Sequence, residues 1–143
     1  MVSVLPDPAT PFGRRVRDRF RDEEVIWLTT VGRDGTPQPN PVWFIWPSEE
    51  EILTYNMPAA HRLAHIAERP AVSLHFNSAE DGNDVVVARG IAERADGEPP
   101  PHESPAYLAK YRAAMLEISG SLEAFASAYP VPVRVRMTRI RGY

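Results

Sequence analysis

The sequence predicts a mainly β protein with flanking helices, built on an antiparallel barrel of about six strands. Short runs of β-branched and aromatic residues recur along the chain, and turn-forming residues separate them. Amphipathic helical segments are too few to cover both faces of a parallel sheet. At 143 residues, the chain is long enough for one sizeable core, so we expect a single domain over residues 1–143.

The composition is that of a folded protein. Hydrophobic residues make up 43% of the chain and charged residues 24%, and the net charge is −3. This acidic balance argues against general nucleic-acid binding, and no apolar run approaches the roughly 18 residues that a membrane helix needs. The N-terminus has no basic segment followed by an apolar one, so we expect a cytoplasmic protein. Because there is no cysteine, disulfides and thiolate chemistry are excluded.

Helical and strand-like periods alternate along the chain. An N-terminal helix is expected over residues 10–22, where Thr10 can act as the cap. The barrel is expected to comprise residues 25–94 and 131–141, and we expect its first three strands to form a meander. The predicted strands are residues 25–31, 41–46, 50–55, 71–76, 84–94 and 131–141. The second strand is apolar on both faces, which predicts core on one side and a ligand or partner subunit on the other.

Two helical segments interrupt these strands. A short helix is expected over residues 58–68, with Pro58 at its first position, and a helical insertion over residues 104–129. In the last strand, the alternation of apolar and charged residues breaks near Thr138, which predicts a bulge. Gly90, in the strand before it, indicates a bulge or a close approach of another backbone.

The start of the helix after the third strand is a candidate phosphate site. A helix N-terminus presents unpaired N–H groups and a partial positive charge. His61 and Arg62 lie in its first turns, and Asn56 precedes it. An arginine can hold phosphate oxygens through paired hydrogen bonds, and an asparagine amide can donate another. By themselves, these residues also suit an ordinary helix start that binds nothing.

The residues around this segment resemble the pyridoxamine 5′-phosphate oxidase-like split-barrel family. Within it, they are most similar to short actinobacterial proteins classed as coenzyme F-420-dependent enzymes. Tyr55 and Asn56 fall where the oxidases have tyrosine and threonine, and His61 and Arg62 where they have arginine and lysine. The resemblance covers residues 25–94. The family's strand along the isoalloxazine ring is matched by Asn40, Pro41, Val42, Trp43 and Phe44.

The resemblance implies a split β-barrel homodimer that binds its cofactor at the subunit interface. It implies an oxidoreductase that transfers hydride between coenzyme F-420 and a small, planar or conjugated organic substrate. A single lysine among 15 arginines fits a high-GC actinobacterial host, which also favours F-420. The alternatives are FMN in the same site, or a non-catalytic barrel that carries haem or a cofactor. The implied cofactor contacts are residues 40–44 with Tyr55 for the ring, and Asn56, Ala60, His61 and Arg62 for the phosphate.

The sequence also departs from the oxidases. Ala60 stands where they have a phosphate-binding serine, and His61 where they have an arginine, which leaves fewer phosphate donors. The C-terminal arginine and histidine that hold pyridoxine phosphate have no clear counterpart. We therefore do not expect oxidation of pyridoxamine phosphate, and no residue stands out as an acid–base catalyst.

Three other groups of residues have more than one interpretation. His61 and His65 could share a metal ion, but the Arg62 cation between them opposes this, and we expect no metal site. Trp43 could stack on the cofactor or be core, whereas Trp27 is expected in the core. A solvated edge strand, rather than a site for nucleic acid or an anionic cofactor tail, is expected for Arg134, Arg136, Arg139 and Arg141.

Overall fold

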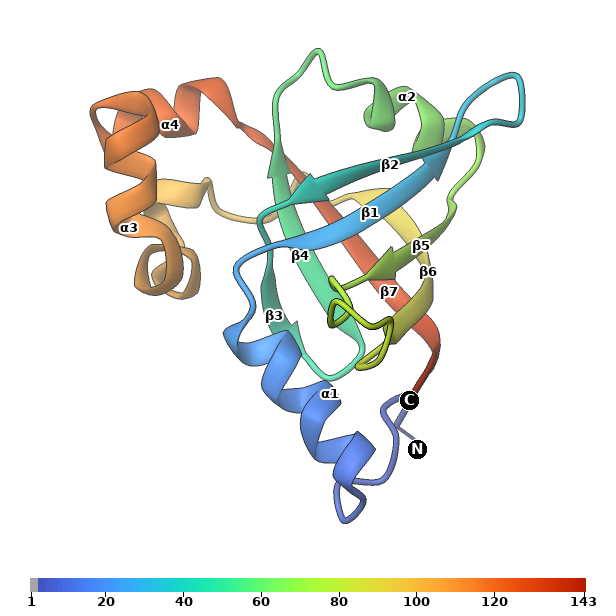
Figure 1. Cartoon of the computed structure of the whole chain (residues 1–143). Coiled ribbons are helices and arrows are strands. Elements are labelled where there is room, and N and C mark those ends of the chain that lie inside the picture. Colours follow the sequence, from blue (N-terminus) through green and yellow to red (C-terminus); the bar gives the residue numbers. More distant parts are fainter. Residues whose placement is uncertain (1–2) are drawn as a thin grey trace.

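The computed structural model describes residues 3–143, which form one sheet of seven antiparallel strands and four α-helices (Figure 1). The strand order is β2-β1-β5-β6-β7-β4-β3. The strands are β1 (Ile26–Val31), β2 (Pro37–Val42), β3 (Ile45–Ser48), β4 (Glu51–Asn56), β5 (Ala71–His75), β6 (Val86–Arg94) and β7 (Val131–Gly142). None of the helices in this part of the chain is long and apolar enough to cross a membrane.

The two edge strands, β2 and β3, are neighbours in sequence, so the sheet curls into a barrel whose two edges meet without pairing. Only Trp43 and Phe44 connect them, so the opposite edges of the sheet must lie close together. The prediction of one strand over residues 41–46 is therefore wrong, as is the meander, because β2 pairs with β1 and β3 with β4. The chain can leave the sheet at Trp43 and Phe44 because the Tyr111 hydroxyl accepts a hydrogen bond from the Phe44 N–H over 2.9 Å.

Strand β2 carries proline at alternate positions, which fixes how it pairs. Pro37, Pro39 and Pro41 lie opposite Val31, Thr29 and Trp27 of β1. Since proline has no N–H, the backbone N–H groups that β2 donates to β1 belong to the residues between the prolines. Two of these, Gln38 and Asn40, lie opposite the buried Thr30 and Leu28, so their side chains are on the inner face of the barrel.

The inner face of the barrel forms the main core, and α1 (Pro11–Asp22) covers one end of it. Thr10 caps this helix by accepting a hydrogen bond from the Gly13 N–H over 2.9 Å. Phe20 is almost fully buried and packs edge-on against Phe44 and Phe76. A helix on one end of an otherwise hollow barrel thus completes its hydrophobic interior.

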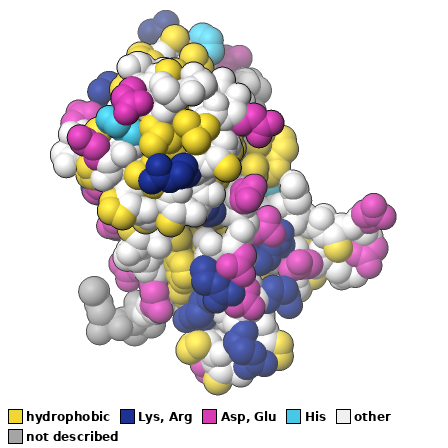
Figure 2. All heavy atoms as spheres, turned by 90° about the vertical axis from the view of Figure 1, so that its left-hand side faces the viewer, with side chains coloured by type: hydrophobic (Ala, Val, Ile, Leu, Met, Phe, Trp, Pro, Cys, Tyr) yellow, Lys and Arg dark blue, Asp and Glu magenta, His cyan; other side chains and the backbone are white. Residues whose placement is uncertain are grey.

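A second cluster lies beside the barrel, where α3 (Pro105–Ser119) and α4 (Leu122–Ala128) pack against β3 and β4. Gly120 ends α3 in the left-handed conformation, as glycine commonly does. Trp43 stacks nearly parallel to Tyr111, with ring centres 4.8 Å apart, and to Phe125 at 5.7 Å. Figure 2 shows this side of the molecule, with hydrophobic side chains toward the end where α4 lies and charged ones toward α1.

The predicted bulge in β7 is present at Thr138. Arg89 pairs with Arg139 and Gly90 with Met137, so Thr138 has no partner in β6. The structure also confirms the close approach at Gly90. A Cβ atom there would lie 2.5 Å from Val135 Cγ1. The glycine therefore permits the tight contact between β6 and β7 at the bulge.

The C-terminal arginines do not form one cluster, and the prediction of an edge strand is wrong at Arg134 and Arg136, where β7 pairs with both β4 and β6. Arg134 lies among three carboxylates, 2.7 Å from Glu98, 3.4 Å from Glu51 and 3.5 Å from Glu93. The others point outward, and none makes an ion pair with residues 3–143. These are Arg136, Arg139 and Arg141.

Candidate functional site

The helix that follows β4, α2 (His61–Glu68), begins later in the sequence than predicted. Pro58 lies in a turn that the Ala60 N–H closes by donating to the Met57 carbonyl over 3.1 Å. Ala60 has extended backbone angles and is the N-cap, so His61 rather than Pro58 is the first helical residue. The prediction that Pro58 opens the helix is wrong because the turn must first reverse the chain. His61 and Arg62 are consequently at the very start of the helix.

The first backbone N–H groups of α2 are free to bind a ligand. The methyl group of Ala60 cannot accept a hydrogen bond, and no side chain caps this helix. The Leu63 N–H donates to the Ala60 carbonyl over 3.1 Å. The backbone N–H groups of His61 and Arg62 have no acceptor within residues 3–143. Two adjacent free donors at the positive end of a helix favour an anion.

Arg62 adds an unpaired positive charge at the same place. Its Nε atom donates to Asn56 Oδ1 over 2.6 Å, and no carboxylate of residues 3–143 lies within ion-pair distance. The side chain is half-buried, and this burial lowers the pKa of Arg62 from its ordinary value. A guanidinium stays charged at neutral pH even so. The site therefore holds a partly desolvated cation whose two terminal nitrogens remain available.

Asn56 is behind Arg62 rather than beside the free donors. It has no exposed surface, and its amide nitrogen donates to Thr54 Oγ1 over 3.0 Å and to the Val131 carbonyl over 3.1 Å. Its oxygen accepts from Arg62. All hydrogens of the Asn56 amide are thus engaged within the protein, and none is left for a phosphate. In this structure, Asn56 orients Arg62.

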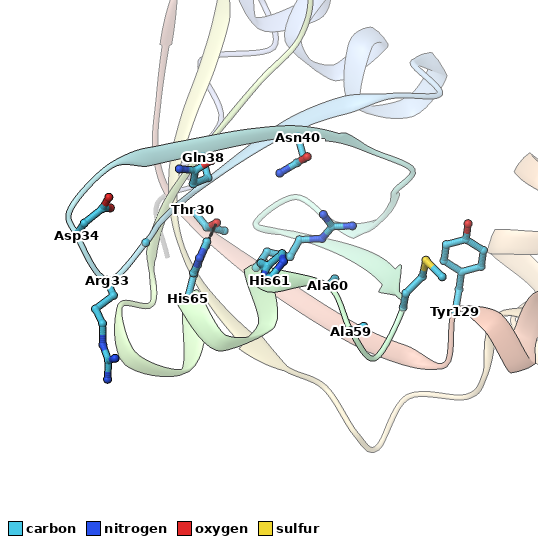
Figure 3. Close-up of a pocket in the computed structure, with 13 residues that line it drawn as sticks. Thr30, Arg33, Asp34, Gln38, Asn40, Ala59, Ala60, His61, His65 and Tyr129 are labelled. Atoms are coloured by element: carbon cyan, nitrogen blue, oxygen red, sulfur yellow. Dashed lines mark hydrogen bonds between the residues drawn. The ribbon is translucent and has the colours of Figure 1, made fainter.

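A large chamber of about 1040 Å³ opens in front of these groups. Figure 3 shows Gln38 and Asn40 of β2 on one side of this space and His61 and His65 of α2 on the other. Arg62 also lines it. The chamber is therefore bounded by the polar inner face of an edge strand and by the cationic start of a helix.

The two histidines of α2 differ in their surroundings. His65 Nδ1 lies 2.8 Å from Oγ1 of the buried Thr30, a hydrogen bond that fixes the ring, whereas His61 is exposed at the helix start. Across residues 3–143, no three metal-ligating side chains come together as a metal site would require. The pair instead gives the chamber one fixed and one free imidazole.

A smaller chamber of about 220 Å³ lies on the other side of Arg62, between the barrel and the helical insertion. Its walls include Trp43, Tyr107 and Phe125, so it is largely aromatic, and it shares Arg62 and Tyr129 with the larger chamber. One cation thus borders both a polar space and a flat-walled apolar one. This combination suits a ligand with an anionic group at one end and a planar ring at the other.

Tyr55 lies in the wall of the aromatic chamber and stays uncharged. Its hydroxyl donates to the Pro99 carbonyl over 2.6 Å. Burial is the main cause that raises the pKa of Tyr55 to about 12, with a smaller contribution from the Glu98 carboxylate. The ring therefore offers a neutral, apolar face at physiological pH.

The structure brings most of the predicted site residues together. The large chamber is lined by Asn40, Ala60, His61 and Arg62, and the aromatic chamber by Pro41, Val42, Trp43, Tyr55 and Arg62. Phe44 reaches neither chamber, because its side chain is fully buried in the barrel core. Trp27 is not core as predicted. It is half-buried on the outer face of β1, where its indole donates to Asn77 Oδ1 over 2.8 Å.

Sequence reasoning missed several wall residues. Gln38 could have been found from the alternation of prolines in β2, which places Gln38 and Asn40 on one face. The aromatic residues of the insertion carry a helical spacing that predicts burial but not what they face. These residues are Tyr107, Phe125 and Tyr129.

Comparison with known proteins agrees with this architecture. The model of the family described as pyridoxamine 5′-phosphate oxidase matches residues 12–139. An F420 reductase structure has a TM-score of 0.60 and 22% identity, covering 87% of this chain and 94% of that one. The conserved hypothetical protein Rv2991 from Mycobacterium tuberculosis has a TM-score of 0.69 and 18% identity, covering 99% and 86%. The haem storage protein HutZ from Vibrio cholerae has a TM-score of 0.61 and 14% identity, covering 90% and 92%. No curated protein sequence matches.

Proposed function

Because the chain belongs to the pyridoxamine 5′-phosphate oxidase family of split β-barrels, we propose that it is an oxidoreductase that uses coenzyme F-420. It would transfer hydride between this deazaflavin and a small organic substrate. The observation that carries the proposal is Arg62, an unpaired cation at an uncapped helix start that borders both chambers. The likeness to an F420 reductase supports this choice of cofactor.

The residues of the larger chamber fit the phosphate of a flavin or deazaflavin. The N–H groups of His61 and Arg62 and the Arg62 guanidinium would hold it, since together they supply several donors and a positive charge without a competing carboxylate. At about 1040 Å³, the chamber is at the upper limit of the roughly 300–1,000 Å³ that is typical of ligand pockets, so it has room for a cofactor. The exposed imidazole of His61 could add a further donor.

The residues of β2 and the aromatic chamber fit a planar ring. Pro41, Trp43 and Tyr55 would present flat or neutral surfaces to it, and the stacking of Trp43 on Tyr111 and Phe125 holds that wall rigid. When bound, a flavin or deazaflavin supplies the hydride-transfer chemistry, while the protein supplies position and charge.

We also propose that the protein is a homodimer whose partner covers the outer face of the sheet. In Figure 1, α3 and α4 lie on one side of the barrel and α2 at its end, whereas β5 and β6 form the opposite side. Apolar side chains are exposed or half-buried there, including Trp27, Val87 and Ile91. Analytical ultracentrifugation tests this proposal, and a monomer at micromolar concentration would contradict it.

FMN is the alternative cofactor for the same residues, since both cofactors carry a phosphate and a three-ring system. Haem carriage is the second alternative. The likeness to a haem storage protein and the imidazoles of His61 and His65 in the large chamber favour it. Each cofactor has its own absorption spectrum, so one titration series with F-420, FMN and haem separates the three functions.

The test is to measure the dissociation constant of each cofactor for the wild-type protein and for Arg62→Ala. We expect F-420 to bind at micromolar concentration and the substitution to weaken it at least tenfold, because a charged hydrogen-bonding partner is lost. Arg112→Ala, at an exposed position of α3, is the matched control and should bind as the wild type does. If neither F-420 nor FMN binds at micromolar concentration, the proposed function is wrong.

A further inference from the structure

Lys110, the only lysine of the chain, lies outside both chambers. It is in a groove of about 340 Å³ between α1, β3 and α3. Its amine donates to the Phe44 carbonyl over 3.0 Å and lies 3.8 Å from the centre of the Phe44 ring. No carboxylate of residues 3–143 is within ion-pair distance of it. The proposed function gives this amine no part.

Burial opposes the positive charge of Lys110, whereas the Phe44 carbonyl and ring favour it. Burial lowers the pKa of Lys110 to about 8, although the carboxylates of Glu24, Asp22 and Glu23 act in the opposite direction. The nearby Arg21 faces the same groove and is bonded to Asp22, which offsets part of that carboxylate's influence. A substantial fraction of the amine is therefore neutral at physiological pH, and a neutral amine is a nucleophile.

Apart from Arg21 and Lys110, the side chains that line the groove are apolar. Phe20 and Trp46 stack with ring centres 5.7 Å apart, and α3 contributes only the methyl groups of Ala106 and Ala109 beside Lys110. Small residues at this i, i+3 spacing leave an open slot along the helix next to the amine. A slot between aromatic rings and a helix surface accepts a planar molecule better than a bulky one.

We propose that Lys110 is a modification site at which the groove admits a small planar aldehyde and the amine forms a Schiff base with it. The Nζ lone pair forms a bond to the carbonyl carbon, and the carbonyl oxygen leaves as water with the two amine hydrogens. A carbon–nitrogen double bond remains, and neither an oxidant nor a reductant is needed. The protonated form of this product is a cation, which the carboxylates of Asp22, Glu23 and Glu24 stabilise.

The same carboxylates argue against an anionic modification. A carbamate formed from carbon dioxide would place a negative charge on Nζ, close to Asp22, Glu23 and Glu24. Repulsion from like charges disfavours this product. The local charge therefore selects a carbonyl compound whose adduct is neutral or cationic.

The test is to treat the full-length protein at pH 7 with benzaldehyde and sodium cyanoborohydride, which reduces the imine to a stable benzyl amine. Mass spectrometry of the intact protein and of its peptides then locates the adduct. The N-terminal amine, whose ordinary pKa is about 8, is the internal reference. We expect Lys110 to react at a rate similar to that of the N-terminus, roughly a hundredfold faster than an ordinary lysine. Lys110→Arg should confine the reaction to the N-terminus.

The variant Ala109→Phe tests the contribution of the groove separately from the reactivity of the Lys110 amine. It fills the slot from an exposed position and leaves the Lys110 amine in place, so benzaldehyde labelling of Lys110 should fall at least fivefold while labelling by the much smaller formaldehyde is retained. The pH dependence of formaldehyde labelling can be measured on the unaltered protein and should have its midpoint near pH 8, because burial lowers the pKa of Lys110 to about 8. The proposal is overturned by wild-type labelling confined to the N-terminus, by a midpoint near 10, or by equal benzaldehyde labelling of Ala109→Phe.

Discussion

The Nε atom of Arg62 donates a 2.6 Å hydrogen bond to Oδ1 of Asn56, whose side chain has no exposed surface. The acceptor is neutral, so it fixes the direction of the guanidinium without cancelling its charge. A carboxylate in the same place would hold the arginine more strongly but would neutralise it. The choice of asparagine therefore leaves a full positive charge available at the start of α2.

Asn56→Asp should neutralise the positive charge of Arg62 at the start of α2. The new carboxylate pairs with Arg62, and it also faces the Val131 carbonyl that the amide had satisfied, so stability should fall by about 1–3 kcal/mol. We expect binding of the phosphate-bearing cofactor to weaken at least tenfold and more than in Asn56→Ala, measured by calorimetry. Asn77→Asp makes the same change at an exposed position outside both chambers and serves as the control. Equal affinities for the two Asn56 variants would refute the role of charge.

Ala60→Asp should change stability and binding in opposite directions. Aspartate is a good N-cap, so it should stabilise α2 by about 1 kcal/mol through a hydrogen bond to the free N–H groups and through the helix dipole. The same carboxylate occupies the donors that the cofactor phosphate needs and repels it. The melting temperature should rise by a few degrees while the affinity for the cofactor falls. Unchanged affinity in a stabilised variant would show that the helix start does not bind the phosphate.

Gly90→Ala should destabilise the barrel. The added Cβ would meet Val135 Cγ1 at 2.5 Å and the Arg136 carbonyl oxygen at 2.9 Å, and the backbone atom cannot move aside easily. Overpacking of this kind costs about 1–3 kcal/mol. Gly97→Ala is the matched control, because a Cβ atom there meets nothing within 4 Å. Urea denaturation of both variants measures the difference, and similar midpoints would contradict the expectation.

Lys110 should make the protein more stable as pH rises from about 8 to about 10. Its pKa is about 8 in the folded protein and ordinarily 10.5, so within this range the unfolded state binds more protons and rising pH favours the fold. Above pH 10, Tyr55, Tyr107 and Tyr111 act in the opposite sense, because burial raises the pKa of each. Denaturant midpoints at pH 7.5 and 9.5 should therefore diverge in the wild type. The divergence should shrink in Lys110→Met, and an identical divergence there would exclude this lysine as the cause.

The strands with a clear alternation could be predicted from the sequence, and the failures have tertiary causes. Residues 41–46 form an unbroken apolar run, and nothing local marks the break at Trp43 and Phe44. The break depends on Tyr111, a residue far along the chain that satisfies the Phe44 N–H. Burial of the backbone polar groups at this point is compensated only once α3 has docked.

The residues of the candidate site could likewise be predicted only in part. His61 and Arg62 could be assigned from the general chemistry of helix starts and from the family resemblance. The role of Asn56 could not, because it depends on which neighbours engage its amide. Nor could the aromatic wall from the insertion be predicted, since periodicity indicates that Tyr107 and Phe125 are buried but not that a chamber lies beside them.

The alternating prolines of β2 have a consequence for behaviour in a crowded solution. A barrel that stays open along one seam exposes a strand edge, and such an edge can recruit strands of other chains into fibrils. At Pro37, Pro39 and Pro41, the outward side of β2 offers carbonyls but no N–H groups, so an incoming strand would find half of its hydrogen-bonding ladder missing. The protein can thus keep an unpaired strand edge beside the two chambers without becoming a template for aggregation.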